Sequence, residues 1–230
     1  MRRVSRKVVS KAITSSALHV FLLIGVVISI LPFYWMVINS LKGRDEVLVV
    51  PPRWWFSTPI FRNYLDVFRE TNFATGFLNT CFVTFTRTPL TILFSAMAGF
   101  AFAKYDFPGR DGLFFFLLAT MMIPGVVTLI PSYMIMVRIR WIDTYQALII
   151  PGLASAFGTF LMRQYMFTIP DELMDAARMD GATDFRLFFQ IALPISVPAL
   201  TSMAIFSFFE NWNDLFWPTI IIRTKTKFTL

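Results

Sequence analysis

The chain has 230 residues, of which 56% are hydrophobic, 17% are aromatic and only 15% are charged. Soluble globular domains carry roughly 25% charged residues, so this composition excludes an ordinary water-soluble fold and favours a protein whose solvent is lipid. The formal net charge is +7, but the cations lie mostly in short stretches between apolar runs. That distribution is typical of loops at a lipid headgroup surface and predicts no nucleic-acid partner.

Metal and enzyme chemistry are disfavoured by the residue inventory. The chain has one histidine, His19, and one cysteine, Cys81, which together cannot build a transition-metal cluster or an internal disulfide. No nucleophile–base pair and no phosphate-binding loop stands out in the sequence. We therefore expect a protein that is not an enzyme, has no metal site and does not itself bind or hydrolyse ATP.

Five stretches are long and apolar enough to cross a membrane, which takes about 20 residues of helix. They cover residues 17–38, 77–103, 113–137, 145–166 and 195–222. Backbone polar groups cannot stay unpaired in lipid, so each stretch is predicted to be a helix. The expected fold class is an all-α integral membrane protein, a polytopic bundle with five spans in this chain.

Prolines interrupt most of these spans, among them Pro32, Pro89, Pro124, Pro151 and Pro198. A proline removes a backbone donor and kinks a helix. One interpretation is a bundle that must bend to open and close. The other is the ordinary tolerance of membrane helices for proline and glycine.

The first eleven residues carry five cations and precede the first span. Because positive charge flanking the first span usually stays inside, residues 1–16 are predicted to be a cytoplasmic segment. Cations counted over the whole chain are equally numerous on the two predicted sides and decide nothing. The outer loop that follows, residues 41–72, holds Trp54, Trp55 and Tyr64 as candidate anchors at the membrane interface.

The polar segment between the fourth and fifth spans, residues 168–194, is here called the elbow. Thr168 is a candidate N-cap, Pro170 suits a first helical turn, and Gly181 permits a sharp turn. A second short helix is expected over residues 184–191, with Phe185, Phe188 and Phe189 on one side. Such a helix pair either lies on the headgroups or docks into a groove of another protein. The lack of a Lys/Arg-rich face favours a protein partner.

The elbow carries a specific motif. Asp175-Ala176-Ala177 is followed by Gly181 and, after nine intervening residues, by Ile191-Ala192-Leu193-Pro194. This spacing resembles the cytoplasmic coupling loop of ABC importer permeases, with aspartate where glutamate is usual. The resemblance implies that the elbow contacts a cytoplasmic ATPase. The residues it assigns to that coupling are Asp175, Ala176, Ala177, Arg178, Asp180, Gly181, Phe185, Ile191, Leu193 and Pro194.

Other segments resemble the maltose-type, carbohydrate-uptake branch of these permeases. They are residues 101–110, Met122-Ile123-Pro124, residues 130–133 and the stretch from Trp212 to Pro218. The resemblance implies a multi-pass protein of a prokaryotic inner membrane, with residues 17–230 forming one transmembrane permease domain. It also implies a second permease, two ATP-binding subunits that hydrolyse ATP, and an extracytoplasmic solute-binding protein. Permeases of this kind have six spans, so we expect a sixth span beyond Leu230.

Polar groups inside spans mark candidate solute contacts. They cluster late in the fifth span as Glu210, Asn211, Trp212, Asn213 and Asp214, a composition that suits a carbohydrate. The same residues would equally serve to bond neighbouring helices. Arg87, inside the second span, either faces the cavity, pairs with Glu210 or Asp214, or reaches the surface.

The leading hypothesis is therefore a sugar-importer permease that forms half of the translocation pathway. Two alternatives stay open on the residues alone. One is an ABC importer permease for a non-sugar solute. The other is a secondary transporter, which would need an ion-coupling carboxylate near the membrane midplane and no ATPase.

Overall fold

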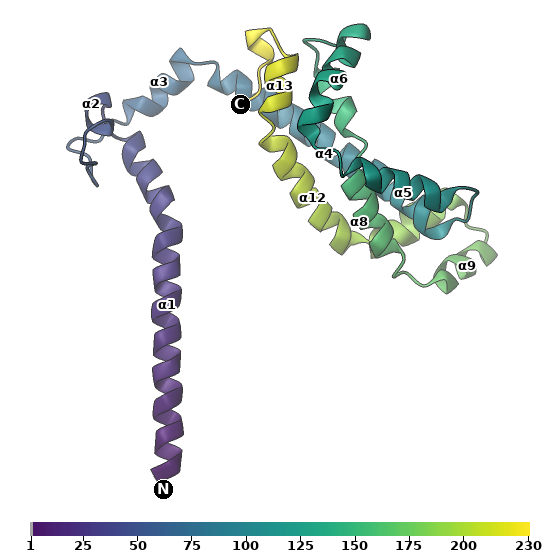
Figure 1. Cartoon of the computed structure of the whole chain (residues 1–230), viewed down its shortest axis with the longest axis horizontal. Coiled ribbons are helices and arrows are strands. Elements are labelled where there is room, and N and C mark those ends of the chain that lie inside the picture. The colour runs from purple at the N-terminus through teal and green to yellow at the C-terminus, as the bar shows by residue number, and fades with distance from the viewer. Residues whose placement is uncertain (1) are drawn as a thin grey trace. The chain divides into compact units, whose positions relative to one another are not determined.

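The computed structural model describes residues 2–230, with side chains described for residues 15–69 and 71–230. The chain forms two compact units, Met1–Thr71 (unit 1) and Asn72–Leu230 (unit 2). The described residues contain helices and no strands, which confirms the predicted all-α class (Figure 1).

Unit 1 begins with a single long helix, α1 (Arg2–Ser40), followed by the short helices α2 (Arg44–Val47) and α3 (Arg62–Glu70). Its stretch Ser15–Ser40 has a mean hydropathy of 2.5. Most large apolar side chains of that stretch are exposed, as lipid-facing side chains are, whereas Ile38 near its end is buried. A loop closes the end of the helix, because the buried Lys42 ammonium donates to Asn39 and to the Arg53 carbonyl at 2.9 and 2.5 Å.

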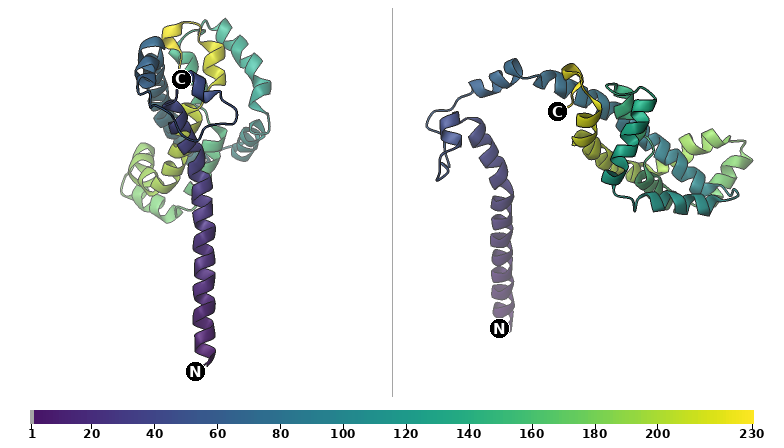
Figure 2. Two further views of the ribbon diagram at one scale, coloured as in Figure 1. Left: turned by 90° about the vertical axis from the view of Figure 1, so that its left-hand side faces the viewer. Right: turned by 45° about the horizontal axis from the view of Figure 1, so that its top comes forward.

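Unit 2 is a bundle of helices that pack around α4 (Phe73–Lys104), as Figure 2 shows. The helices after α4 are α5 (Arg110–Thr120), α6 (Gly125–Arg138), α7 (Tyr145–Ile149), η1 (Ile150–Gly152), α8 (Ala156–Met166), α9 (Asp171–Met179), α10 (Asp184–Arg186), η2 (Leu187–Ala192), α11 (Leu193–Ile195), α12 (Val197–Trp212), α13 (Phe216–Ile221) and η3 (Lys225–Lys227). α8 and α12 lie against α4. Gly99 allows the closest approach, since a Cβ there would lie 2.6 Å from the Met162 Cβ.

The two ends of α4 carry different structures, which gives unit 2 a direction. At one end the Lys104 ammonium donates to the Ile169 carbonyl at 2.5 Å, so this end holds the elbow. At the other end the Asn79 amide donates to the carbonyls of Thr226 and Phe228, both at 2.9 Å. These are called the elbow end and the far end of unit 2. In Figure 1, α9 and α13 mark these two ends.

Three helical segments are long and apolar enough to span a membrane by themselves: Ser15–Ser40, Phe73–Lys104 and Tyr145–Met166. The count becomes five if two bent helix pairs are each one span. The contacts support that count for α5 and α6. Arg163 pairs with Asp111 at the elbow end, whereas the Asp143 amide, just after α6, donates to Ile221 at the far end. The α5–α6 pair therefore crosses the bundle, and the described chain has three to five candidate spans, a range that includes the predicted five.

The third span differs from the expected single helix over residues 113–137. It is two helices, α5 and α6, that meet at 101°. Pro124 has no N–H for the helical ladder and disfavours helical backbone at the residue before it. Likewise the fifth span begins only at Val197. An 80° bend separates it from Asp184–Ile195, and Pro198 cannot continue the ladder of that preceding helix.

Within the elbow, the expected glycine turn is confirmed, because Gly181 has φ +81°. The expected cap is wrong: the Thr168 hydroxyl donates back to the Tyr165 carbonyl at 2.7 Å, and Pro170 precedes α9 without a side-chain cap. The second elbow helix runs from Asp184 to Ile195, longer than predicted, and contains the π-helical η2. Of its phenylalanines, Phe188 is buried and Phe185 is exposed, and both line one hollow beside Tyr105.

Candidate functional site

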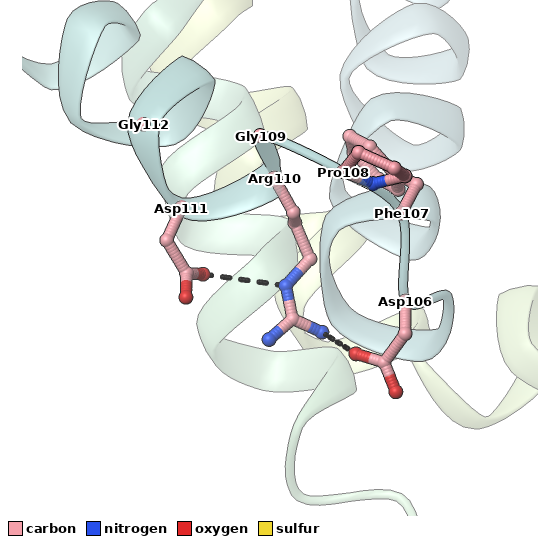
Figure 3. Close-up of a pocket in the computed structure, with 7 residues that line it drawn as sticks. All are labelled: Asp106, Phe107, Pro108, Gly109, Arg110, Asp111 and Gly112. Atoms are coloured by element: carbon pink, nitrogen blue, oxygen red, sulfur yellow. Dashed lines mark hydrogen bonds and ion pairs between the residues drawn. The ribbon is translucent and has the colours of Figure 1, made fainter.

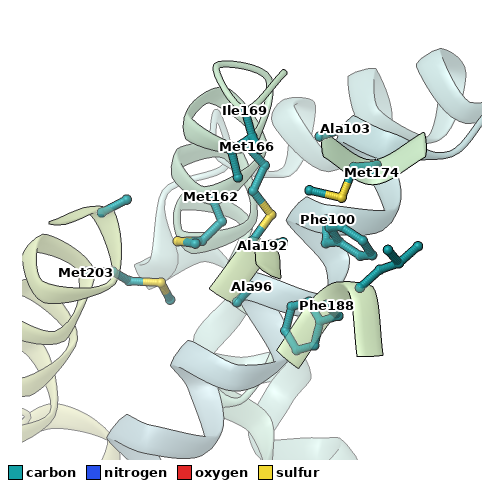
Figure 4. Packing of buried hydrophobic residues seen from close by; sticks show 12 residues of the cluster. Ala96, Phe100, Ala103, Met162, Met166, Ile169, Met174, Phe188, Ala192 and Met203 are labelled. Atoms are coloured by element: carbon teal, nitrogen blue, oxygen red, sulfur yellow. The ribbon is translucent and has the colours of Figure 1, made fainter. Parts of the chain in front are cut away.

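Buried apolar side chains seat the elbow on the bundle, and Met174 is the one that α9 contributes. This side chain is 1% exposed and lies in a cluster with Met166, Ile169, Phe100 and Phe188. Figure 4 shows the Met174 thioether beside the Phe100 ring, with Phe188 below. Because the cluster draws on α4, α8 and the elbow together, a displacement of α9 must also move α4 or α8.

Polar contacts also hold the elbow on the bundle, one at the start of α9 and one after its end. The Lys104 ammonium, on a side chain only 3% exposed, pairs with Asp171 at 2.6 Å. The Tyr105 hydroxyl donates to Asp184 at 2.6 Å. Burial and the neighbouring Asp184 carboxylate raise the pKa of Tyr105 to about 12, so the phenol keeps its proton at neutral pH. Sequence reasoning missed both residues as elbow anchors, although they lie in the stretch 101–110 that carried the family resemblance.

The residues assigned to coupling divide into two groups. Most of them face away from the bundle: Asp175, Ala176, Arg178, Asp180, Gly181, Phe185 and Pro194 are exposed. Arg178 pairs within the helix with Asp175 at 3.1 Å. Ala177, Ile191 and Leu193 are half-buried and pack against the apolar cluster. The exposed group adds Met179, which is 88% exposed and was not singled out by the sequence.

The loop before α5 lies at the same end and has its own internal ion pairs. Figure 3 shows Arg110 between two carboxylates, Asp106 at 2.5 Å and Asp111 at 3.3 Å. Gly109 has φ +83°, which lets the chain turn sharply before the helix starts. This loop encloses a hollow whose charged lining residues are Asp106, Arg110 and Asp111. The three side chains are paired with one another.

A cavity of about 440 Å³ lies between α4, the η1–α8 region and α12. Its polar lining consists of Arg87, Thr91, Thr120, Ser155, Ser207, Glu210 and Asn211. Arg87 lies near the middle of α4, so the cavity sits between the elbow end and the far end. The hydroxyls of Thr91, Thr120 and Ser155 were not predicted, because serine and threonine occur throughout membrane helices without functional meaning.

Arg87 pairs with Asp214, one of its two predicted partners. The Arg87 Nη1 lies 3.6 Å from Asp214 Oδ2 and 3.5 Å from the Leu148 carbonyl oxygen. The Arg87 Nε is buried and has no hydrogen-bond partner among the described residues. Toward the far end the space beside this pair narrows to a seam of about 10 Å³, lined by Thr80, Trp212 and Asp214 among others. Arg87 lines both the cavity and this narrow space, and Asp214 lines the narrow space.

The remaining predicted solute residues are not equivalent. Glu210 is exposed at the cavity wall, and no ion pair involving it occurs in the described part of the chain. Asn211 is buried and its amide donates to the Thr88 and Ser207 hydroxyls at 3.0 and 3.4 Å. Trp212 stacks on Phe208, and the Asn213 amide donates to the Phe209 carbonyl at 2.8 Å. Asn211 and Trp212 therefore contact α4, whereas Asn213 is exposed and bonds only within its own helix among the described residues. Glu210 presents a carboxylate without an ion pair in that part of the chain.

Residues 91–227 match the model of the family described as "Binding-protein-dependent transport system inner membrane component". The arabinooligosaccharides transport system permease protein AraQ of Bacillus subtilis is 35% identical over 217 residues, covering 93% of this chain and 77% of that protein. The sn-glycerol-3-phosphate transport system permease protein UgpE of Pectobacterium atrosepticum is 31% identical, covering 89% and 75%.

Among solved structures, a chain of a bacterial ABC transporter involved in the import of the acidic polysaccharide alginate superposes with a TM-score of 0.83. It is 26% identical, over 95% of this chain and 77% of that one. The family match, the apolar membrane-spanning helices and the seated elbow agree with one another. The chain belongs to the binding-protein-dependent transport system inner membrane components, the membrane-embedded permease subunits of ABC importers.

Proposed function

We propose that this permease forms half of the translocation pathway for a sugar and is moved by ATPase subunits that dock on the elbow. In this proposal a second permease supplies the other half of the pathway. An extracytoplasmic binding protein delivers the solute, and two ATP-binding subunits hydrolyse ATP, while this chain binds no cofactor. The names of the AraQ relative and of the alginate importer support a carbohydrate, and UgpE marks the alternative of a phosphorylated polyol.

The coupling role is supported by the contrast between the exposed tip of the elbow and its buried base. Its tip exposes Ala176, Met179 and Phe185, whereas its base, Met174, is fully buried. Large apolar side chains that protrude from a polar segment are typical of a surface that a partner covers. A partner that pulls on this tip acts on α4 and α8 through the buried base, and α4 carries Arg87 into the cavity.

The cavity supports the solute role. Its hydroxyl groups and the Glu210 carboxylate can exchange hydrogen bonds with sugar hydroxyls, and Phe157 and Phe206 supply apolar surface for the C–H faces of a sugar ring. Arg87 is already paired with Asp214, which leaves Glu210 as the charged group free to contact a solute. We therefore assign Glu210 as a solute contact and Arg87 and Asp214 as the pair that closes the pathway toward the far end.

Cysteine crosslinking in the assembled importer tests the coupling assignment. In a Cys81→Ser background, Ala176→Cys is expected to crosslink to a cysteine placed on the ATPase subunit. Thr219→Cys, exposed in α13 at the far end, serves as the matched control and is expected not to crosslink. Crosslinking from Thr219 but not from Ala176, with transport intact, would overturn the assignment.

A further inference from the structure

The charged groups at the cavity of about 440 Å³ do not balance one another. Arg87 and Glu210 line this cavity, and Asp214 lines the narrow space beside it. Arg87 and Asp214 lie 3.6 Å apart, so the cation is already matched by one carboxylate. The other polar side chains of the lining are hydroxyls and one amide, which carry no charge. The unmatched charge at the cavity is therefore negative, and it belongs to Glu210.

The packing of Arg87 keeps its positive charge beside Asp214. A Cβ on Gly152 would overlap the Nη2, Nε and Cζ atoms of Arg87, so the guanidinium occupies the space that any other residue at position 152 would fill. Only 15% of the Arg87 side chain is exposed, and its Nη1 lies 3.5 Å from the Leu148 carbonyl oxygen. The guanidinium is thus held against the Gly152 backbone, where little of it faces a solute.

Glu210 differs from that buried pair. It belongs to α12, is exposed at the cavity wall and has no ion pair in the part of the chain that the structure describes. Phe157 and Phe206 form apolar wall of the same cavity. A fixed charge between apolar walls acts on an entering solute more strongly than the same charge in open water, because the walls screen it poorly. Glu210 therefore sets the sign of the electrostatic potential in this cavity.

The sign of that potential separates two classes of solute. The hydroxyl groups of a neutral sugar can donate to the Glu210 carboxylate, and hydrogen bonds to an ionised acceptor are the stronger kind. A phosphorylated polyol or a uronic acid would instead bring a second anion toward Glu210. Arg87 offers such an anion little compensation, because its charge is already paired with Asp214. A repulsive group of this kind is a common source of specificity.

We propose that Glu210 is a specificity-determining residue that selects neutral sugars over anionic ones, a proposal that rests on the proposed importer function. The solute class is then a neutral carbohydrate, and the phosphorylated polyol suggested by the UgpE relative is disfavoured. The selection acts on passage through the membrane, whichever solutes the binding protein delivers.

The test uses the complete importer in nanodiscs, where both faces of the membrane are open to solution. A cysteine replaces Ala154, an exposed residue of the cavity lining, in a Cys81→Ser background. It is labelled with a glucose-linked methanethiosulfonate and, separately, with the glucuronate counterpart, which carries a carboxylate in place of one alcohol. The measured quantity is the neutral-to-anionic ratio of labelling rates, with and without ATP, divided by the same ratio for a small thiol free in solution.

The corrected ratio is expected to be about ten in the Ala154→Cys importer. Adding Glu210→Gln, which removes the charge and keeps the shape, is expected to lower the ratio to between about one and two, whereas Glu210→Asp should keep it near about ten. Glu172→Gln is the charge-matched control, because Glu172 is exposed in α9 at the elbow end and has no ion pair among the described residues. It should leave the ratio unchanged.

A ratio near one in the Ala154→Cys importer, or equal effects of Glu210→Gln and Glu172→Gln, would overturn the selectivity proposal and leave the proposed importer function intact. A cation of the second permease that neutralises Glu210 would produce that result. If the cysteine at position 154 resists both reagents with and without ATP, the cavity is not open to solutes. The pathway role in the proposed function then fails, and the selectivity proposal fails with it.

Discussion

The Arg87 guanidinium and the Asp214 carboxylate, 3.6 Å apart, join the middle of α4 to the short break between α12 and α13. Asp214 also accepts from the Trp217 amide at 3.3 Å, so the same carboxylate starts α13. One pair thereby links a mid-membrane charge to an irregular backbone segment at the side of the cavity that narrows toward the far end. Its loss is expected to affect both stability and transport.

Removing one member of that pair should be worse than removing both. Asp214→Asn leaves Arg87 with the Leu148 carbonyl at 3.5 Å as its remaining polar contact in the described structure. Fully buried pairs cost about 3–5 kcal/mol when one partner is lost, and the partial exposure of both side chains reduces the expected cost to about 1–2 kcal/mol. Thermal unfolding in detergent of Asp214→Asn, Arg87→Gln and the double variant checks this. Additive losses in the double variant would show that the two groups are not coupled.

Gly181→Ala isolates the effect of backbone strain in the elbow. A Cβ on Gly181 would meet no atom within 4 Å, so any penalty comes from φ +81° and amounts to about 1–2 kcal/mol locally. The elbow turn should loosen, and transport per ATP hydrolysed should fall while membrane insertion is unchanged. Gly112→Ala is the matched control, because its Cβ also meets open space but it lies inside α5. There the change should be neutral or stabilising by up to about 1 kcal/mol. Equal transport ratios in the two variants would contradict the strain argument.

The contact between α4 and α8 should tolerate no added methyl at Gly99. A Cβ there would lie 2.6 Å from the Met162 Cβ and 2.8 Å from the Arg163 backbone nitrogen, which cannot move without shifting the helix. We expect Gly99→Ala to destabilise the protein by about 1–3 kcal/mol. A Cβ at Gly158 would meet the flexible end of Met203 and the Ser95 side chain, whose Oγ and Cβ would lie 2.6 and 3.0 Å away. None of these is a backbone atom, so the cost of Gly158→Ala should be smaller than that of Gly99→Ala. Melting temperatures of the two variants check the order, and a reversed order would mean that the helices separate more easily than their close packing implies.

The hydrogen bonds that Asp143 accepts from Thr224 and Arg223 should persist in mild acid. Hydrogen bonds from Thr224 and Arg223, helped by Lys227, lower the pKa of this carboxyl well below its ordinary value of 3.8. A lowered folded-state pKa adds stability that is complete above the unfolded-state value and disappears as pH falls toward the folded-state value. The melting-temperature difference between the unchanged protein and Asp143→Asn should thus be constant from pH 7 to about 5 and shrink below about pH 4. If the difference already shrinks between pH 7 and 6, the pH-dependent stability must come from a group other than Asp143.

Much of the candidate site could be predicted from the sequence. The elbow's position, its glycine turn and the pairing of Arg87 with a fifth-span carboxylate follow from local motifs and from the high cost of an unpaired charge in lipid. The contacts that hold the elbow on the bundle could not be predicted. Lys104 bonds to Asp171 and Tyr105 bonds to Asp184, and each pair is separated by more than sixty residues of chain. The functional roles of the elbow and cavity residues stay predictions.

The sequence by itself determined that this chain is a membrane protein with five apolar stretches of spanning length and that it belongs with the importer permeases. Span length and hydropathy are local properties of the chain, and so is the spacing of the elbow motif. Only the tertiary structure decided that the third span bends by 101°, and that Asn211 bonds to a neighbouring helix while Glu210 has no ion pair in the described residues. Those features depend on which side chains meet once the helices pack. The pattern of apolar residues along one helix carries no information about contacts with residues distant in the sequence.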